Sequence, residues 1–350
     1  MTFIKFLLIP FQLIYYLIVR FRNLLFDLHI ITEHKASTLV ISIGNLKVGG
    51  TGKTPMVEYL IKAFKKYKTA VLSRGYKRKT KGFVLAGNNK NTANHIGDEN
   101  CQLYNKFRDI TIVCDENRVN GIKQLLKIDN EIQIVILDDG YQHRSLKRDM
   151  NILLTEFNDL FTNDSLLPRG KLREPIFEKR RANIIIVTKC PQDISEQTQK
   201  SIKEKINLDF SQKIYFSYIS KYHFLDMQTS KIVNLNKKLN HLLVTGIESP
   251  RTLLSFLKEK KVSYNHIKFN DHHNFSQSDI NKIIQLGKSK KYAKELLFTE
   301  KDFYRLSKTD KQKLEKHFRL ICIQIEIDFI DVDKSNFNHQ LCNFVKSKIT

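Results

Sequence analysis

ISIGNLKVGGTGKTPMVEYL, residues 41–60, runs from an apolar strand pattern through a glycine-rich turn into an amphipathic helix pattern. In this context the backbone N–H groups of the turn and the N-terminus of the helix bind phosphate. A lysine at position 53 reaches the outer phosphates, and the hydroxyl of Thr54 holds Mg²⁺. We therefore expect a nucleotide-binding loop made by Gly49, Gly50, Thr51, Gly52, Lys53 and Thr54.

The spacing within this loop is unusual. Lys47 stands where the common pattern has its first glycine. Pro55 follows in the first helical turn, which tolerates proline because an N–H there has no intrahelical partner. A glycine turn that binds no ligand stays the alternative, but Gly-Lys-Thr directly after a strand favours a phosphate loop.

A second signal is IQIVILDDGYQH, residues 132–143, in which an apolar strand pattern ends in two acids. Phosphoryl transfer needs a carboxylate at the end of a neighbouring strand to organise the metal and its waters. We therefore expect Asp138 and Asp139 near Mg²⁺; an acidic turn after a core strand is the alternative. His143 is expected either to orient a carboxylate or a phosphate, or to be structural.

Short β-rich runs alternate with helical ones after residue 37, which is typical of a parallel sheet covered by helices. Several runs, such as NIIIVT, are continuously apolar, as in strands buried on both faces. Expected strands are 38–43, 69–73, 110–114, 132–137, 151–155, 183–188, 241–245, 267–269, 296–299 and 320–327. Expected helices are 54–67, 98–106, 118–127, 250–260 and 276–288. Residues 213–235 alternate differently and predict a two-stranded ribbon between two α/β domains.

The N-terminal stretch FIKFLLIPFQLIYYLIVRFRNLLFDL, residues 3–28, is the most apolar part of the chain. Its uncharged run between Lys5 and Arg20 is shorter than the ~20 residues that a membrane-spanning helix needs. No cleavage pattern follows it. Aromatic and basic side chains flank the apolar ones, which favours a helix lying in the lipid headgroup layer; a buried N-terminal helix is the alternative.

The composition is that of a folded globular protein, with 41% hydrophobic and 27% charged residues among 350. Lys and Arg exceed Asp and Glu by 59 − 36 = 23. This excess suits a nucleic acid, an anionic membrane or a phosphorylated substrate. No Trp and no recognisable nucleic-acid module are present, so no nucleic-acid partner is expected. Five widely spaced cysteines without a CxxC pair predict a reduced, cytosolic protein without structural zinc.

Three further charged segments gain meaning beside a nucleotide site. LLPRGKLREP, residues 166–175, is an ordered loop with donors for phosphate and one carboxylate for metal or ribose. HIGDENCQLY brings Asp98 to the start of a helix, where a carboxylate is also stabilised by the helix dipole alone. NDHHNFS holds His272 and His273; adjacent histidines rarely reach one metal, which favours a base or a phosphate-binding role.

The order of the blocks GNLKVGGTGKTP, LSRGYKRKTKG, GDE, DDGYQHRSLKRD, LLPRGKLREP, TGIESP, DHHNF and TEKD closely resembles the lipid A tetraacyldisaccharide 4′-kinase family. The resemblance extends from the N-terminal apolar helix to about Asp302. It implies transfer of the ATP γ-phosphate to the 4′-hydroxyl of tetraacyldisaccharide 1-phosphate, which gives lipid IVA. It also implies a peripheral or monotopic location at the cytoplasmic face of the inner membrane of a Gram-negative bacterium.

The resemblance implies a fold and a division of the chain. The fold is α/β: a P-loop NTPase-like parallel sheet domain, a second, smaller α/β domain joined to it by a β-ribbon, and an N-terminal membrane-associated helix. The expected boundaries are 1–33 for the membrane helix region, 34–212 for the P-loop kinase domain, 213–240 for the ribbon and 241–350 for the smaller domain. ATP would lie in the cleft between the domains.

The resemblance also implies roles for the site residues. Lys53 and Thr54 would bind the β- and γ-phosphates and Mg²⁺. Asp98 would be the catalytic base, paired with His272 of the second domain, although His273 next to it leaves this pairing open. The metal environment would be completed by Asp138, Asp139 and Glu174. The phosphates would be contacted, or the carboxylates oriented, by Arg118, His143 and Arg173.

Two other functions stay open on the sequence alone. A P-loop ATPase that binds nucleic acid would explain the positive charge but leaves the amphiphilic N-terminus unexplained. A membrane-associated nucleotide switch would need no chemical role for Asp98 or His272.

Overall fold

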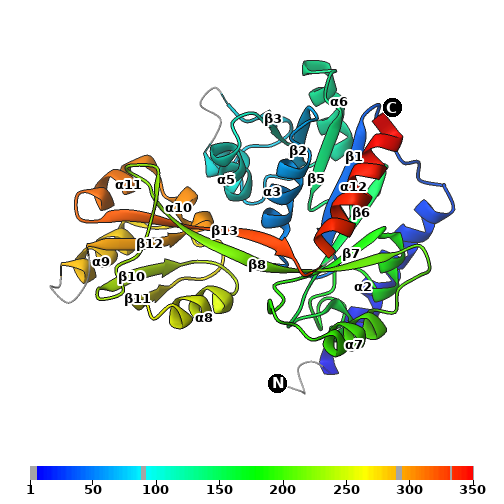
Figure 1. The fold of residues 1–350 in the computed structure, drawn as a ribbon. Helices are drawn as coiled ribbons and strands as arrows, with labels where there is room; N and C mark the ends of the chain where they lie inside the picture. The colour runs from blue at the N-terminus through cyan, green and yellow to red at the C-terminus, as the bar shows by residue number, and fades with distance from the viewer. Residues whose placement is uncertain (1–5, 88–91, 289–293, 332, 350) are drawn as a thin grey trace.

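The computed structural model describes residues 6–87, 92–288, 294–331 and 333–349. These residues form two α/β lobes joined by two long strands (Figure 1). One 13-stranded sheet passes through both lobes within the described residues. Its strand order is β11-β10-β12-β13-β8-β7-β6-β1-β5-β2-β4-β3, with β9 paired to β8.

The first lobe is built on a largely parallel sheet, as the continuous apolar runs predict. Its strands are β1 (Leu39–Asn45), β2 (Thr69–Ser73), β3 (Val84–Leu85), β4 (Thr111–Cys114), β5 (Ile134–Asp138), β6 (Met150–Glu156) and β7 (Ile184–Thr188). Strand β1 is buried along its whole length between β5 and β6, to which it is parallel. Ile43 of β1 pairs with Asp138 of β5, so the phosphate loop and the acidic strand end leave the sheet side by side.

Helices pack on both faces of this sheet (Figure 1). They are α3 (Lys53–Ala63), α4 (Ala93–Ile96), α5 (Asp98–Lys106), α6 (Arg118–Ile128) and α7 (Glu196–Ile206), with 3₁₀ turns at Phe161–Asn163 and Ile176–Arg181. Helix α6 begins where the Asn117 side chain accepts hydrogen bonds from two backbone N–H groups of the first turn. This cap fixes the position of Arg118, the first residue of the helix.

The ribbon between the lobes differs from the prediction. Strand β8 (Lys213–Asp226) does pair with a short β9 (Lys231–Val233). Its long partner, however, is β13 (Arg319–Phe329), which runs antiparallel to it from Asp226 to Ser217. The sequence predicts 320–327 as a strand of the second domain alone, because nothing local shows that it continues into the first.

The second lobe adds three strands parallel to β13, namely β10 (Asn240–Thr245), β11 (Ser263–Lys268) and β12 (Glu295–Thr299). Its helices are α8 (Arg251–Glu259), α9 (Gln277–Gly287), α10 (Glu300–Arg305) and α11 (Lys308–Glu315). Their apolar side chains enclose a separate core around Val244, Ile283 and Phe298. Helix α9 begins with a capping box between Ser276 and Asp279.

The last helix, α12 (Asp333–Ile349), returns to the first lobe. Its buried residues Phe337, Leu341 and Val345 belong to the same core as Ile41 of β1. The predicted domain 241–350 is therefore corrected: α12 belongs to the first lobe, because its apolar face is buried in the core of that lobe.

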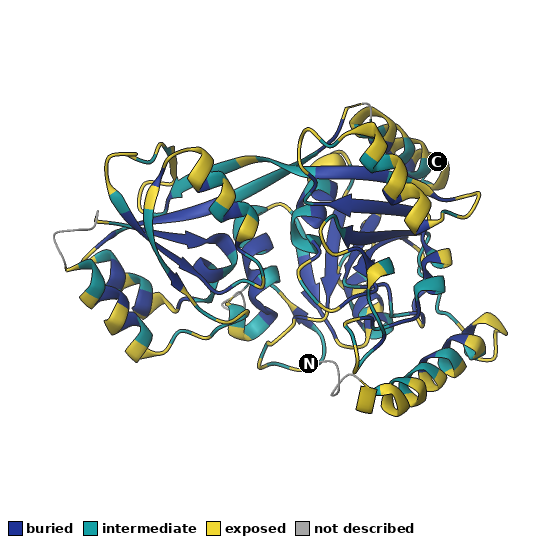
Figure 2. Ribbon diagram, turned by 90° about the horizontal axis from the view of Figure 1, so that it is seen from below, coloured by how far each residue is buried: buried dark blue, intermediate teal, exposed yellow. Residues whose placement is uncertain are grey.

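Helix α2 (Ile9–Asp27) lies at the edge of the first lobe (Figure 2). Only Val19, Asn23 and Phe26 are buried against the lobe. Large exposed apolar side chains cover the rest of the helix, at Phe11, Leu13, Ile14, Leu17, Ile18, Phe21 and Leu24. Among the described helices, none has the length and apolar character needed to cross a membrane. The first five residues of the predicted membrane region lie outside the described residues.

A buried polar cluster joins the lobes beside the sheet. Glu300 of α10 accepts hydrogen bonds from Gln324 of β13 at 2.7 Å and from Gln102 of α5 at 3.1 Å. Lys106 of α5 lies 3.3 Å from the same carboxylate and 2.7 Å from Glu58 of α3. The cluster thus ties two elements of the first lobe to the start of α10.

Candidate active site

The phosphate loop, residues 49–54, lies between β1 and α3, and the backbone N–H of Gly50 contacts the other lobe. Gly49 and Gly52 have φ of 131° and 85°, conformations that favour glycine. The side-chain amide of Asn45 donates to the Thr51 hydroxyl at 2.8 Å and holds the loop from β1. Lys47, at the position of the missing first glycine, is 3% exposed and pairs with Asp164 at 2.9 Å, outside the loop.

A carboxylate of the second lobe is bound in this loop. Glu248, which follows β10, accepts the backbone N–H of Gly50 through Oε2. A Cβ on Gly49 would meet both Glu248 carboxylate oxygens at 2.7 Å, so the glycine leaves room for the carboxylate at this point. Lys171 lies 3.6 Å from the other side of the carboxylate. The loop therefore binds an anion with its backbone, which is the property that a nucleotide phosphate requires.

The acidic pair at the end of β5 is split into two environments. Asp138 is 2% exposed, and its Oδ1 has no hydrogen-bond partner within the described chain. Burial, with the nearby charges of Glu99 and Asp139, raises the pKa of Asp138 to about 7. Asp139 has φ of 51° and lies 3.6 Å from the ammonium of Lys53. Burial alone would raise the pKa of Asp139, but Lys53 and Arg173 hold it well below its usual value.

Two basic residues flank this pair. Arg173 donates to both oxygens of Asp139, at 3.1 and 2.9 Å, and also to the side chain of Asn45. Arg118 is 1% exposed and uses Nη1 on the carbonyls of Asp115 and Glu116. Its Nε and Nη2 have no partner among the described residues. A buried guanidinium with two unused donors is suited to an anion that completes the site.

His143 lies beyond Asp139 on the same turn, half-buried. Burial and the charge of Arg118 lower the pKa of His143 to about 3, so the imidazole is neutral at physiological pH. Thr54 is half-buried in the first turn of α3, at the position that the sequence predicts for the metal-binding hydroxyl.

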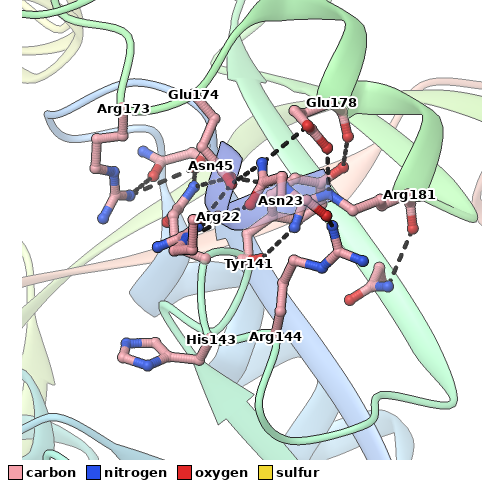
Figure 3. A network of polar contacts seen from close by, with 12 residues as sticks. Arg22, Asn23, Asn45, Tyr141, His143, Arg144, Arg173, Glu174, Glu178 and Arg181 are labelled. Atoms are coloured by element: carbon pink, nitrogen blue, oxygen red, sulfur yellow. Dashed lines mark hydrogen bonds and ion pairs between the residues drawn. The ribbon is translucent and has the colours of Figure 1, made fainter. Parts of the chain in front are cut away.

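Glu174 is placed differently from the prediction (Figure 3). Its Oε1 accepts from Arg22 and Asn23 of α2, each at 3.1 Å. Its Oε2 accepts from Gln142 at 2.9 Å and from Arg181 at 2.6 Å. Four donors occupy the lone pairs of a carboxylate. The predicted metal role is therefore corrected: Glu174 anchors α2 to the lobe.

Asp98 and His272 meet where the two lobes contact each other. Asp98 is the first residue of α5 in the first lobe, and its Oδ2 lies 2.9 Å from Nδ1 of His272 in the loop after β11. Gly97, with φ of 86°, precedes Asp98; a Cβ there would lie 2.9 Å from the carbonyl oxygen of Tyr76. The ring of Tyr76 in turn packs edge-on against the imidazole of His272, with centroids 4.9 Å apart.

The neighbouring histidine faces away from this pair. Nε2 of His273 lies 2.9 Å from Asp279 in the first turn of α9, and its ring stacks on Phe269 with centroids 4.5 Å apart. The structure therefore brings His272, and not His273, to Asp98. His272 itself has φ of 55°, a backbone conformation that is uncommon outside glycine.

Two residues that sequence reasoning missed complete the pair. Arg305 donates to Oδ2 of Asp98 from Nε at 2.8 Å and from Nη2 at 2.7 Å. Lys301 lies 3.1 Å from Nε2 of His272 and 3.2 Å from Glu99. Both stand on α10: Lys301 lies within the TEKD block of residues 299–302, and Arg305 follows it. The three-residue spacing of Asp302 and Arg305 on one helix predicts that these two side chains pair. It does not predict the contact of Arg305 with Asp98.

These cations decide the charge state of Asp98. Burial alone would raise the pKa of Asp98, but the hydrogen bond from His272 and the charges of Lys301 and Arg305 hold it far below its usual value. Asp98 is therefore an ionised acceptor at any physiological pH. Because the ionised Asp98 can only accept a hydrogen bond, we assign the proton of the His272 ring to Nδ1 and the lone pair to Nε2.

The residues present fit a magnesium ion that is bound together with a nucleotide. No group of three or more His, Cys, Asp or Glu converges on one point within the described ranges. Mg²⁺ is commonly held by one or two carboxylates, with waters and substrate phosphates as the other ligands. The unpartnered Oδ1 of Asp138 supplies such a carboxylate oxygen at the strand end beside the phosphate loop.

Comparisons with known proteins agree over the whole chain. A family model described as tetraacyldisaccharide-1-P 4′-kinase matches residues 4–346. The chain is 41% identical to the tetraacyldisaccharide 4′-kinase of Flavobacterium johnsoniae, over 100% of this chain and 99% of that protein. It is also 41% identical to the enzyme of that name from Bacteroides thetaiotaomicron, over 97% of this chain and 93% of that protein.

A solved structure is similar to the fold. This is a crystal structure of LpxK from Aquifex aeolicus in complex with ATP, with a TM-score of 0.74 and 26% identity, covering 98% of this chain and 99% of that one. The likeness confirms the predicted P-loop fold on a mixed, largely parallel sheet.

Proposed function

The chain belongs to the tetraacyldisaccharide-1-P 4′-kinase family, and from this membership we infer its reaction and the residues that carry it. It is an ATP-dependent kinase that transfers the γ-phosphate of ATP to the 4′-hydroxyl of tetraacyldisaccharide 1-phosphate in lipid A biosynthesis. We propose that this occurs between the lobes, with the nucleotide on the first and the sugar hydroxyl at Asp98 and His272. The contact of this pair between the two lobes is the observation that carries the proposal.

The nucleotide phosphates are proposed to replace the Glu248 carboxylate on the loop amides. Lys53 and the two unused donors of Arg118 then face the β- and γ-phosphates, where negative charge must be balanced during transfer. Asp138 and Thr54 would hold Mg²⁺, with Asp139 beside them. When bound at these residues, Mg²⁺ would supply positive charge against that of the phosphates. Arg173 keeps Asp139 oriented through its two hydrogen bonds.

The geometry refines the proposed role of Asp98. Its Oδ2 already accepts from three donors, which makes it a poor acceptor for a further proton. We therefore propose that Nε2 of His272 takes the proton of the 4′-hydroxyl while Asp98 orients the ring. The sugar oxygen then forms a bond to the γ-phosphorus as the bond from that phosphorus to the β-phosphate bridging oxygen breaks, and ADP leaves. Lys301, now 3.1 Å from Nε2, has to yield to the substrate hydroxyl.

Helix α2 is proposed to bring the enzyme to its lipid substrate. One face of α2 is docked by Asn23, and the other exposes Phe11, Leu17 and Phe21. An apolar helix face with basic neighbours suits the interface of an anionic leaflet. This supports a peripheral or monotopic location at the cytoplasmic face of the inner membrane.

The function is tested by following labelled γ-phosphate from ATP into tetraacyldisaccharide 1-phosphate in detergent micelles. Wild type should give a labelled lipid in the presence of Mg²⁺ and none after chelation. Asp98→Asn and His272→Gln should each lower the rate by about 100-fold or more while ATP still binds. An inactive wild type that binds ATP would instead favour a nucleotide switch, and unchanged rates in both variants would refute the assigned pair.

A further inference from the structure

Arg305 makes several polar contacts where the two lobes meet, and the proposed reaction gives it no step of its own. It is the last residue of α10, and its side chain is 3% exposed. Nε and Nη2 both donate to one oxygen of Asp98, and Nη1 donates to the Gly246 carbonyl at 2.8 Å. Its Nη2 is 3.3 Å from Nδ1 of His272. One guanidinium therefore contacts both members of the pair.

The second lobe holds this guanidinium firmly. Asp302, which is fully buried, lies 2.9 Å from Nη1 of Arg305 through Oδ1. Its other oxygen accepts the backbone N–H of Gly246 at 2.9 Å and the Thr299 hydroxyl at 2.5 Å. Gly246 follows β10 and Thr299 ends β12, so Asp302 ties Arg305 to the carboxyl ends of two strands. The guanidinium has little freedom to follow Asp98 if the lobes separate.

The same ion pair crosses from one lobe to the other. Asp98 starts α5 on the first lobe, and α5 and α10 pack against each other. His272 is carried by the second lobe, and its backbone N–H donates to the Gly246 carbonyl at 3.1 Å. The Gly246 carbonyl therefore accepts from both Arg305 and His272. The contact of Arg305 with Asp98 therefore also brings the imidazole of His272 to the Asp98 carboxylate.

We propose that Arg305 is a positioning residue for phosphoryl transfer: it docks the second lobe on Asp98 and so sets His272 in register with the nucleotide on the first lobe. This role rests on the proposed function of Asp98 and His272. The role depends on the planar shape of the guanidinium, whose N–H groups bond Asp98, Asp302 and the Gly246 carbonyl at the same time. The ammonium group of a lysine is a single point of charge and cannot replace these contacts. Closure of the lobes and assembly of the pair are then one event.

The proposal predicts a split between binding and turnover. Arg305 touches no group of the phosphate loop, so Arg305→Met should leave the Kd for ATP within about threefold by titration calorimetry. Misplacement of reacting groups by about 1 Å costs on the order of 100-fold in rate, so kcat should fall by about that factor. Arg305→Lys keeps the charge but not the fork and should recover only a part of the loss.

A matched control comes from Arg319→Met. Arg319 also bonds an aspartate within the second lobe, Asp226 at 2.8 Å, but stands away from the cleft. It should keep the wild-type kcat. Asp302→Asn leaves Arg305 in place but loosens it, and should lower kcat with little change in ATP binding. This variant and Arg305→Lys decide the question if Arg305→Met fails to fold by circular dichroism.

The outcomes distinguish the positioning role of Arg305 from the proposed function of the enzyme. If wild type transfers phosphate and Arg305→Met keeps kcat within about threefold, the positioning role is refuted while the proposed function stands. Equal loss of ATP binding and kcat in all the Arg305 and Asp302 variants also refutes it, because it indicates a merely structural role. If wild type transfers no phosphate, the proposed function itself fails.

Discussion

Arg173 donates a hydrogen bond to each oxygen of Asp139, with Nη1 3.1 Å from Oδ2 and Nη2 2.9 Å from Oδ1. Two parallel hydrogen bonds of this kind fix the plane of a carboxylate, which a lysine cannot do. The same guanidinium also donates to Asn45, the last residue of β1. Arg173 thereby joins the acidic strand end to the start of the phosphate loop.

Arg173→Lys should therefore impair turnover although it keeps the positive charge. We expect kcat to fall by about 10- to 100-fold, because Asp139 loses its fixed orientation beside Lys53. Steady-state assays of phosphate transfer measure this loss. Arg169→Lys, on the same loop but without a contact to Asp139, is the control. Equal rates for Arg173→Lys and wild type would show that charge alone matters at this position.

Asp138 should lower the stability of the enzyme without ligands while serving its reaction. It is a buried carboxylate whose Oδ1 has no partner in the described chain, and such a group is costly to bury. Asp138→Asn keeps the shape and removes the charge. We expect the apo variant to melt a few degrees above wild type, since about 1 kcal/mol shifts Tm by that much. Its phosphate transfer should fall by about 100-fold or more.

Differential scanning calorimetry without nucleotide and the transfer assay with Mg²⁺ test these two effects together. Asp193→Asn, at an exposed position, should change neither quantity. A lower Tm for Asp138→Asn would contradict the view that this carboxylate is held for a cation.

Glu248 should compete with ATP for the phosphate loop. Its carboxylate already accepts the N–H of Gly50, so the nucleotide must displace it. Glu248→Gln weakens this internal contact. We expect ATP to bind about 3- to 10-fold more tightly, because a hydrogen bond to a neutral amide is about 1 kcal/mol weaker than one to a charged carboxylate. Titration calorimetry measures it, with Glu259→Gln on α8 as the control. Weaker ATP binding would mean that Glu248 contacts the nucleotide.

The parts of the fold that local pattern determines could be predicted from the sequence. Strands β5 and β7 are continuous apolar runs, and the loop after β1 has the glycine pattern expected of a phosphate-binding loop. Parallel strands place their carboxyl ends at one edge, so the nearness of Asp138 to the loop followed from two motifs. The choice between His272 and His273 did not follow, because it depends on which ring the turn after β11 directs at another lobe.

Long-range pairing accounts for what the sequence did not reveal. The apolar face of α12 would suit either core, and only tertiary packing shows that Phe337 lies beside β1. Glu174 reads as a free carboxylate until the docking of α2 supplies its donors. Arg305 reads as one more basic residue among 59 Lys and Arg until Asp98 lies opposite it.

Helix α2 should bind vesicles through its exposed face without affecting the nucleotide site. Leu17 and Phe21 are 55% and 63% exposed, on the side away from Asn23. The double variant Leu17→Glu, Phe21→Glu removes apolar area and adds repulsion from anionic lipid, so flotation with vesicles of phosphatidylglycerol and phosphatidylethanolamine should be lost. ATP binding should stay unchanged. Phe210→Glu with Ile232→Glu, at exposed apolar positions outside α2, should float as wild type does. Unchanged flotation of the α2 variant would refute the anchor.

Glu300 should make the stability of the enzyme depend on pH. Burial and the charge of Glu58 raise the pKa of Glu300 from 4.5 to about 7, although Lys106 lies 3.3 Å away. Between these values the folded protein holds a proton that the unfolded chain has released. The free energy of unfolding contributed by Glu300 therefore falls as pH rises through this range and levels off above about 7.

Glu300→Gln removes this dependence. The amide keeps the size of the side chain, and Glu58 still pairs with Lys106 at 2.7 Å. The stability of the variant relative to wild type should therefore rise with pH, by at most about 1.4 kcal/mol per unit. Urea unfolding at several pH values between about 5 and 8 measures this difference, with Glu259→Gln as the control. A difference that is constant with pH would mean that Glu300 stays ionised between the lobes, as the partner of Lys106.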